Sequence, residues 1–354
     1  MSSNTTGDSA RDIAPSVNPG DGAPPAPALD FTSVMRSQQV DGTATVAEKG
    51  AAQPKPAADP RVEMHDRIAQ LFNVVEAEEG DPSKKATWQH GVNLRELGNM
   101  QLQTGDLADG RLCLKAGNEV MYKATDKPKE AELTITEGLV DYGKALLIAP
   151  PKQPVAYRQR DLREANEVFG SVVDRASHEH RAPEDIAAML QLKANTDMAM
   201  ADTNDPKTPA GKTAFVADMQ SAMTDLTSGL DMLKDRHQPE TILTEAKLHS
   251  ERAFAETQLN ALDRNNWYDN VWGAGLVGRG QYDVAGDYKQ SIDLWHQVKP
   301  TDRQGQVDKD EELLTTLARY KTALSSAGDK TGAAAADKEE QAILGNHPNW
   351  KMKI

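Results

Sequence analysis

From Arg61 onward, apolar residues recur every three or four positions. This spacing is typical of amphipathic helices, and no stretch alternates with period two for long enough to predict a strand. The pattern predicts an all-α protein with roughly twelve helices between residues 61 and 346. The residues that carry it are Met64, Ile68, Leu71, Phe72 and Val75, then Ile186, Met189, Leu190 and Ala194, then Phe215, Met219, Met223, Leu226, Leu230 and Leu233, then Ile242, Leu243, Leu248, Phe254, Leu259 and Leu262.

The first sixty residues have a different composition. They contain eight of the nineteen prolines and a single aromatic residue, Phe31. Such a segment buries too little apolar area to offset its ordering entropy. We therefore predict a disordered arm over residues 1–60 and a helical repeat domain over residues 61–350. The apolar patch at residues 29–35 within the arm is either a chance cluster in a linker or a docking motif, for a partner or for this protein's own body.

One segment, residues 91–124, carries a repeat motif. Leu97-Gly98 falls on a predicted helix, Gly105-Asp106-Leu107 falls at a predicted turn, and Gly110 falls on the next helix. Small residues at these positions let two helices cross closely without a clash between side chains. Partial copies occur at residues 272–300, through Gly286-Asp287-Tyr288, and at residues 314–348, through Gly328-Asp329-Lys330.

These motifs resemble the tetratricopeptide repeat, which has Leu-Gly on its first helix, Gly-Asp followed by an aromatic residue or leucine at its turn, and small residues on its second helix. The resemblance implies an antiparallel helix-pair solenoid, a tetratricopeptide-like superhelix. A non-repetitive helical bundle is the alternative. Between residues 130 and 262 the motif is lost, and there Gly138, Gly143 and Gly170 predict close approaches between helices.

The resemblance also implies a concave groove lined by the first helix of each pair. Aligned on Leu97-Gly98, the candidate peptide-groove residues are Val92, Arg95, Asn99, Leu102 and Gln103. Asn99 can donate and accept hydrogen bonds with a peptide backbone. Arg95 can pair with a carboxylate. A solvated polar helix face is the alternative interpretation of these positions.

Charge and cysteine content narrow the choice of partner and compartment. The formal net charge of −14 argues against a nucleic-acid partner, because an acidic chain repels phosphate backbones. Residues 1–60 contribute −3 of it (four basic, seven acidic), which leaves −11 on the rest and favours a basic partner surface over an acidic one. Cys113 is the single cysteine, so no intramolecular disulfide forms. With no predicted membrane span and no signal-peptide pattern, we expect a cytoplasmic protein; export by a signal-peptide-independent route is the alternative.

Motifs for catalysis or cofactor binding are incomplete. Residues 210–213 resemble the end of a phosphate-binding loop, but Pro206 stands where the motif needs glycine. His178 and His180 are two residues apart, so their side chains diverge on a helix. We therefore predict no catalytic, cofactor-binding or metal-binding residues.

The combined prediction is a non-enzymatic scaffold, adaptor or chaperone that binds a protein or peptide in its groove. A secreted bacterial effector whose arm is the export signal is one alternative, and a helical enzyme without a recognisable motif is another. Four of the five tryptophans lie in the last third of the chain, where they indicate either a better-packed core or an aromatic binding surface. They are Trp267, Trp272, Trp295 and Trp350.

Overall fold

A computed structural model describes residues 60–234, 236, 238–264, 283–347 and 350. The described residues form eleven α-helices and no strand, so the predicted all-α class is confirmed. The helices are α1 (Pro60–Glu79), α2 (Trp88–Gln103), α3 (Leu107–Lys123), α4 (Ala131–Leu147), α5 (Val155–His178), α6 (Pro183–Ala201), α7 (Pro209–Leu233), α8 (Pro239–Arg264), α9 (Val284–Gln297), α10 (Arg303–Ala327) and α11 (Lys330–Asn346). The predicted disorder of the arm lies outside the described residues, except at Pro60, which begins α1.

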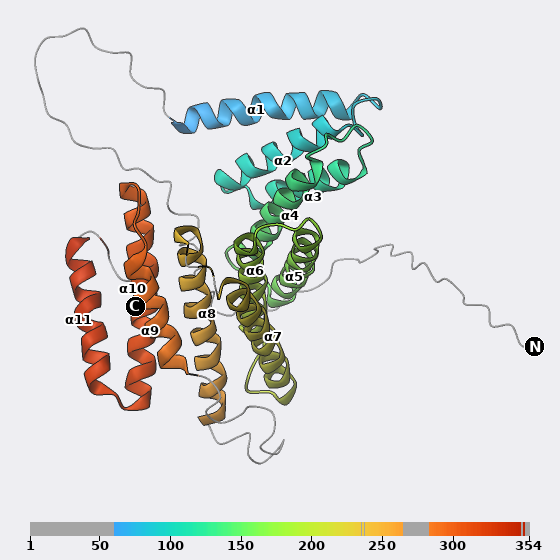
Figure 1. The fold of residues 1–354 in the computed structure, drawn as a ribbon. Coiled ribbons are helices and arrows are strands. Elements are labelled where there is room, and N and C mark those ends of the chain that lie inside the picture. The colour runs from blue at the N-terminus through green and yellow to red at the C-terminus, as the bar shows by residue number, and fades with distance from the viewer. Residues whose placement is uncertain (1–59, 235, 237, 265–282, 348–349, 351–354) are drawn as a thin grey trace, which may run out of the picture.

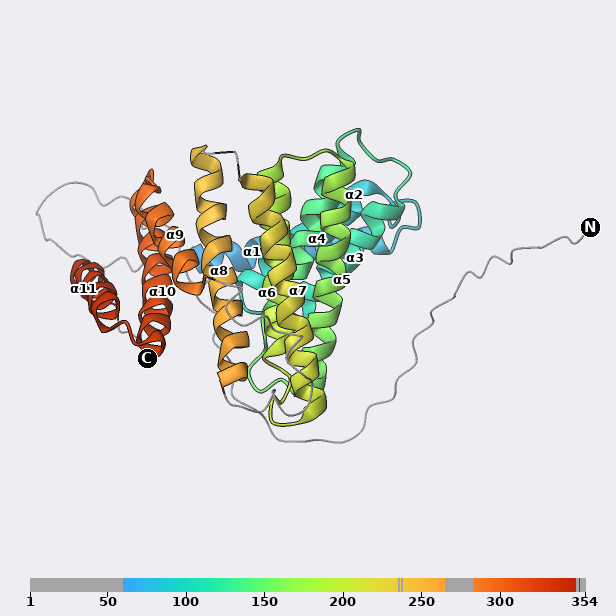
Figure 2. The same cartoon turned by 60° about the horizontal axis from the view of Figure 1, so that its bottom comes forward.

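The helices stack as consecutive pairs, from α2–α3 to α10–α11, with α1 over α2 at one end (Figure 1). Each second helix packs on the first helix of the next pair, and first helices also meet directly in α2–α4, α6–α8 and α8–α10. In Figure 2 the middle helices α4 to α8 stand side by side. This arrangement is the all-α helical-repeat fold that the sequence predicts. No helix in the described part of the chain is both long and apolar enough to cross a membrane.

A glycine seam joins α2 to α3. A Cβ on Gly98 would lie 2.8 Å from the Gly110 carbonyl oxygen, and a Cβ on Gly91 would lie 2.9 Å from that of Gly117. The glycines therefore face each other in two pairs, with the two glycines of each helix seven residues apart, and the backbones approach where any side chain would collide. The predicted close packing at Gly98 and Gly110 is confirmed, and Gly91 extends the seam beyond the motif.

The turns of two pairs are built alike. Gly105 and Gly328 both adopt a positive φ, of 87° and 85°. The following residues, Asp106 and Asp329, cap α3 and α11 by accepting hydrogen bonds from backbone N–H groups. Gly105 thus supplies a left-handed residue at the turn that the motif predicts. The close helix packing also predicted for Gly105 is wrong, because a Cβ there would meet nothing within 4 Å.

Two other glycine-based predictions are also wrong. Gly286-Asp287-Tyr288 is not a turn, because Asp283 caps α9 and all three residues lie within its first turns. Gly170 does not mark a close approach, since a Cβ there would also meet nothing within 4 Å. Gly138 and Gly143 do mark close approaches, with Asn118 and the Phe169 ring within 3 Å of where a Cβ would be.

The core consists of separate apolar clusters along the stack, and buried aromatic residues contribute to it in the later pairs. Trp295 and Tyr288 are fully buried, which favours the core interpretation of these two residues. Trp350 stacks on His347 with ring centroids 3.7 Å apart. Trp267 and Trp272 lie outside the described residues. The segment that resembles a phosphate loop is a helix start, where Pro209 opens α7 and Thr208 caps it by accepting a hydrogen bond from the Gly211 N–H.

Candidate binding cavity

The helix α1 is seated on α2 through one apolar face. Ile68, Leu71 and Val75 share that face because they are spaced at three and four residues, and they pack against Leu94 and Leu97. The opposite side of α1 leaves apolar residues in solvent, including Phe72, which is 52% exposed. Helix α1 therefore closes the end of the stack without itself being covered by another described helix.

Polar contacts hold the two ends of α1 unequally. Near its C-terminus, Glu78 accepts hydrogen bonds from Asn93 (3.0 Å) and lies 3.0 Å from Nδ1 of His90, whose side chain is buried. Near its N-terminus, the ion pair of Arg67 with Glu96 spans 2.6 Å but is exposed on both sides. Exposed ion pairs contribute at most about 1 kcal/mol. The N-terminal half of α1 is therefore the more weakly attached half.

An open cavity of about 650 Å³ lies between this weakly attached half of α1 and the face of α2 beneath it. That volume is in the range of sites that take a few side chains or a small molecule. Three of the lining residues are apolar, and the others are polar or charged. The lining consists of Glu63, Met64 and Arg67 from α1, and of Val92, Arg95, Glu96, Asn99, Met100 and Gln103 from α2.

The structure brings four of the five predicted groove residues to this cavity. Val92, Arg95, Asn99 and Gln103 line it, as expected from their shared face of α2. Leu102 does not, because it packs against the Gly110 position and the core around Leu114. The structure therefore places Leu102 in the packing between α2 and α3 and outside the lining of this cavity. Its side chain fills the space that the missing Cβ of Gly110 leaves open.

The environment of Arg95 changes its predicted role. Its Nε and Nη2 donate to Oδ2 of Asp141 on α4 (2.9 and 2.8 Å), and its Nη1 lies 3.5 Å from Glu137. Asn99 also donates to Asp141, at 3.1 Å. Because two carboxylates already neutralise the Arg95 guanidinium, it would contribute little to binding the carboxylate of a ligand. Arg95 and Asn99 instead tie α2 to α4 at the side of the cavity.

The α1 side of the cavity was not predicted from the sequence. The helical spacing of Met64 with Ile68 and Leu71 indicates one buried face, but not which helix it meets or that a cavity remains there. The nearest signal is the pair Arg67 and Glu96, which only the fold brings together. Met100 belongs to the α2 face between Asn99 and Gln103 and was missed because the alignment to the repeat did not include it.

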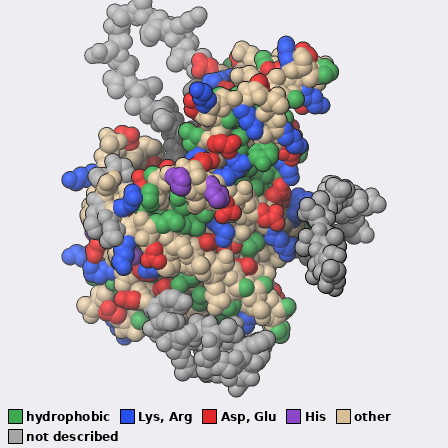
Figure 3. All heavy atoms as spheres, turned by 45° about the vertical axis from the view of Figure 1, so that its right-hand side comes forward, with side chains coloured by type: hydrophobic (Ala, Val, Ile, Leu, Met, Phe, Trp, Pro, Cys, Tyr) green, Lys and Arg blue, Asp and Glu red, His purple; other side chains and the backbone are tan. Residues whose placement is uncertain are grey.

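The charge around the cavity is negative on balance. Glu63 and Glu96 line it with Arg67 and Arg95, and Glu137 and Asp141 stand behind Arg95. Glu63 has no ion-pair partner among the described residues. Elsewhere the molecule has mixed charge: the face drawn in Figure 3 intersperses acidic and basic side chains. A cationic group therefore suits this cavity better than an anionic one.

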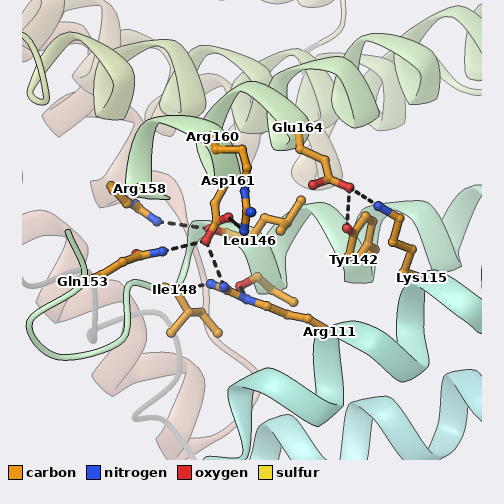
Figure 4. Close-up of polar contacts among 11 residues, drawn as sticks. Arg111, Lys115, Tyr142, Leu146, Ile148, Gln153, Arg158, Arg160, Asp161 and Glu164 are labelled. Atoms are coloured by element: carbon orange, nitrogen blue, oxygen red, sulfur yellow. Dashed lines mark hydrogen bonds and ion pairs between the residues drawn. The ribbon is translucent and has the colours of Figure 1, made fainter. Parts of the chain in front are cut away.

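A second polar cluster joins α3, α4 and α5 (Figure 4). Arg111 donates to the Ala145 carbonyl oxygen (3.0 Å) and to Asp161 (3.0 Å), and Arg158 donates to the Leu146 carbonyl oxygen (3.0 Å). These guanidinium groups satisfy carbonyls at the C-terminus of α4, where the helix leaves them without partners. These contacts tie the three helices together, and none of the cluster's residues lines the cavity between α1 and α2.

The same cluster extends to a buried phenol. The Tyr142 hydroxyl donates to Glu164 at 2.6 Å, and Lys115 donates to the same carboxylate oxygen at 2.7 Å. Burial, followed by the neighbouring carboxylate, raises the pKa of Tyr142 above its usual range. No group of three or more His, Cys, Asp or Glu side chains suited to holding a metal occurs in the part of the chain that the structure describes.

The fold and the cavity define a class, the all-α helical-repeat proteins, in which a stack of helix pairs presents an open cavity at one end. No protein-family model matches the sequence. No curated protein matches it either. The structure is similar to the crystal structure of BtubC (BKLC) from P. vanneervenii, with a TM-score of 0.46 and 12% identity, over 82% of this chain and 94% of that chain. One fold supports many functions, and a likeness of this size assigns none to this chain.

Proposed function

We propose that the protein is a non-enzymatic scaffold, adaptor or chaperone that binds a protein or peptide segment in the cavity between α1 and α2. The observation that carries the proposal is the cavity itself, which combines apolar Met64, Val92 and Met100 with a polar lining that Glu137 and Asp141, behind Arg95, make acidic on balance. Apolar area supplies affinity in such a site, and the charged rim supplies selectivity. The resemblance of residues 91–124 to a tetratricopeptide repeat supports the same use of the α2 face. In this proposal the protein acts in the cytoplasm.

The chemistry of the site favours a segment with an apolar anchor next to a lysine or arginine. An apolar side chain can reach Met64 and Met100, and a neighbouring cation can reach Glu63. An acidic segment would meet Glu63, Glu137 and Asp141 and would be repelled.

Fluorescence anisotropy with short labelled peptides tests this proposal. The peptides carry leucine or methionine beside arginine, and their counterparts carry glutamate in place of arginine. We expect binding of the basic set only, weakening as salt rises. Met64→Lys should abolish it by placing a cation among the anchors. Val74→Lys is the matched control, because Val74 lies on the same helix, is 44% exposed and does not line the cavity. Equal binding by both variants, or equal binding of both peptide sets, would refute the proposal.

A further inference from the structure

The residues at the N-terminal wall of the cavity are also the residues at which the arm joins the body. Helix α1 begins at Pro60, and Glu63, Met64 and Arg67 in its first turns line the cavity. The arm therefore leaves the body at the edge of the cavity, and whatever the arm carries is held close to that edge by covalent connection.

The arm carries one segment with the chemistry that the cavity suits. Across residues 29–36, Leu29, Phe31, Val34 and Met35 are apolar, and Arg36 follows directly. The segment also contains Asp30, Thr32 and Ser33, but its C-terminal end, Val34-Met35-Arg36, places two apolar side chains directly before a cation, the order that the anchors and Glu63 favour. Arg36 is also on the α1 side of the segment along the chain, as Glu63 is at the start of α1.

The linker between the segment and α1 is long enough to let the segment reach the cavity and short enough to keep it nearby. Residues 37–59 link the segment to α1. The root-mean-square span expected for a linker of that length is about 25 Å, so the connection permits the segment to reach the cavity. Linkers of this kind give effective concentrations of order 1 mM. Even a weak segment is then bound for much of the time.

From these observations we infer that residues 29–36 dock in the cavity between α1 and α2 as an intramolecular occupant that competes with the external partner. The inference rests on the proposed function, since both use the same cavity. Phe31, Val34 or Met35 would reach Met64, Val92 and Met100, and Arg36 would pair with Glu63. A partner must then displace the segment, so the arm sets a threshold for binding.

Photo-crosslinking in the full-length protein tests the inference directly. A benzophenone amino acid replaces Phe31, and in a control protein it replaces Thr43, which is nearer to α1 along the chain but lies outside the apolar segment. We expect crosslinks within one molecule from position 31 to peptides that contain Met64, Val92 or Met100, and their loss in Met64→Lys but not in Val74→Lys. Crosslinks that are spread over the surface as they are from position 43, or that join two molecules, would overturn the inference.

A binding measurement separates this inference from the proposed function. The double variant Val34→Asp/Arg36→Glu in the full chain should bind the basic peptides on the order of tenfold more tightly than the unaltered protein, because the competitor is lost. Peptide binding that is lost in Met64→Lys but unchanged by the arm variant refutes only the docking of the arm. If no basic peptide binds either protein, the proposed function fails, whereas the crosslinking result still decides where the arm docks.

Discussion

The pairs α2–α3 and α8–α9 solve the same packing problem with opposite chemistry. In α2–α3, Gly91, Gly98, Gly110 and Gly117 bring two backbones into contact, and among the described residues no ion pair joins these two helices. In α8–α9 the seam is polar, and buried Asp287 of α9 meets charged groups of α8. A seam of glycines depends on shape alone. A seam of charges depends on each partner being present and in the correct protonation state.

The polar seam centres on Asp287. Its carboxylate accepts two hydrogen bonds from Arg252 (both 2.7 Å) and lies 2.8 Å from Nδ1 of His249. Burial raises the pKa of Asp287, but hydrogen bonds from His249 and Arg252 outweigh it, and the net shift is downward. Glu256 lies in the same seam and is buried as well. Burial first, and then the charge of Asp287, raise its pKa to about 8.

The largest expected effect is that of Asp287→Ala. It leaves the Arg252 guanidinium and the His249 ring in the seam without their acceptor, and breaking a buried pair in this way costs about 3 kcal/mol. Chemical denaturation followed by circular dichroism measures the loss. Asp287→Asn keeps one acceptor oxygen and should lose less. If Asp287→Ala lowers the free energy of unfolding by under about 1 kcal/mol, the polar seam does not stabilise the pair.

Gly98→Ala tests the opposite seam. The new Cβ would lie 2.8 Å from the Gly110 carbonyl oxygen and 2.9 Å from the Leu114 backbone nitrogen, so α2 and α3 must separate. Overpacking of this kind costs about 2 kcal/mol. Hydrogen exchange should show faster exchange in α2 and α3 than in α8 and α9, because repeats are coupled mainly to their neighbours. The control is Gly170→Ala, which has open space and should gain about 0.5 kcal/mol from helix propensity. Equal losses from both substitutions would contradict the seam.

The contrast between the seams also explains what could be predicted from sequence. The close packing at Gly98 and Gly110 was predictable because its glycines lie near one another in the sequence at a fixed spacing. Asp287 was misplaced in a turn because Gly286-Asp287-Tyr288 imitates Gly105-Asp106-Leu107, and only the fold shows that Asp283 is the cap. Its partners His249 and Arg252 are 38 and 35 residues away, and nothing in their local sequence marks the pairing.

Only the α2 side of the cavity could be predicted from the sequence, because only that side depends on local spacing. Its α2 side follows from helix periodicity, which places Val92, Arg95, Asn99 and Gln103 on one face. Its α1 side depends on the position at which α1 packs against α2. That position is set by burial of Ile68, Leu71 and Val75 and by the contacts of Glu78, so it is a property of tertiary packing.

Glu256→Gln should change how stability depends on pH. A carboxyl group with a pKa of about 4.5 when unfolded and about 8 when folded binds more protons in the folded state between those values. Its contribution to stability is therefore present below pH 4.5 and is lost as pH rises through 8. We expect the variant to match the unaltered protein at pH 5 and to gain on the order of 1 kcal/mol at pH 8. Thermal unfolding at the two pH values measures the difference.

Comparing the variant with the unaltered protein at each pH isolates Glu256 from other groups. Glu251 and Asp218 have pKa values raised by burial to about 7 and about 6, and they titrate in both proteins. The charged groups that face Glu256 are Arg252 on its own helix and Asp287 and Asp283 at the start of α9. A difference between the two proteins that is the same at pH 5 and pH 8 would show that Glu256 does not titrate in this range.

The smallest effects concern the turns that the first and last pairs share. Gly105→Ala and Gly328→Ala each force a side chain into the left-handed region at a φ near 86°, with no steric contact to add to the cost. Each should therefore lose about 1 kcal/mol, and because the geometry is the same the two losses should agree. Gly345→Ala is the control, since it lies within α11 and a Cβ there meets nothing, so helix propensity should make it slightly stabilising. Differential scanning calorimetry of the three variants measures these changes in stability. Unequal losses at Gly105 and Gly328 would mean that the turns are alike in geometry but not in their contribution to stability, and that the Gly-Asp motif does not act as an independent unit in the two pairs.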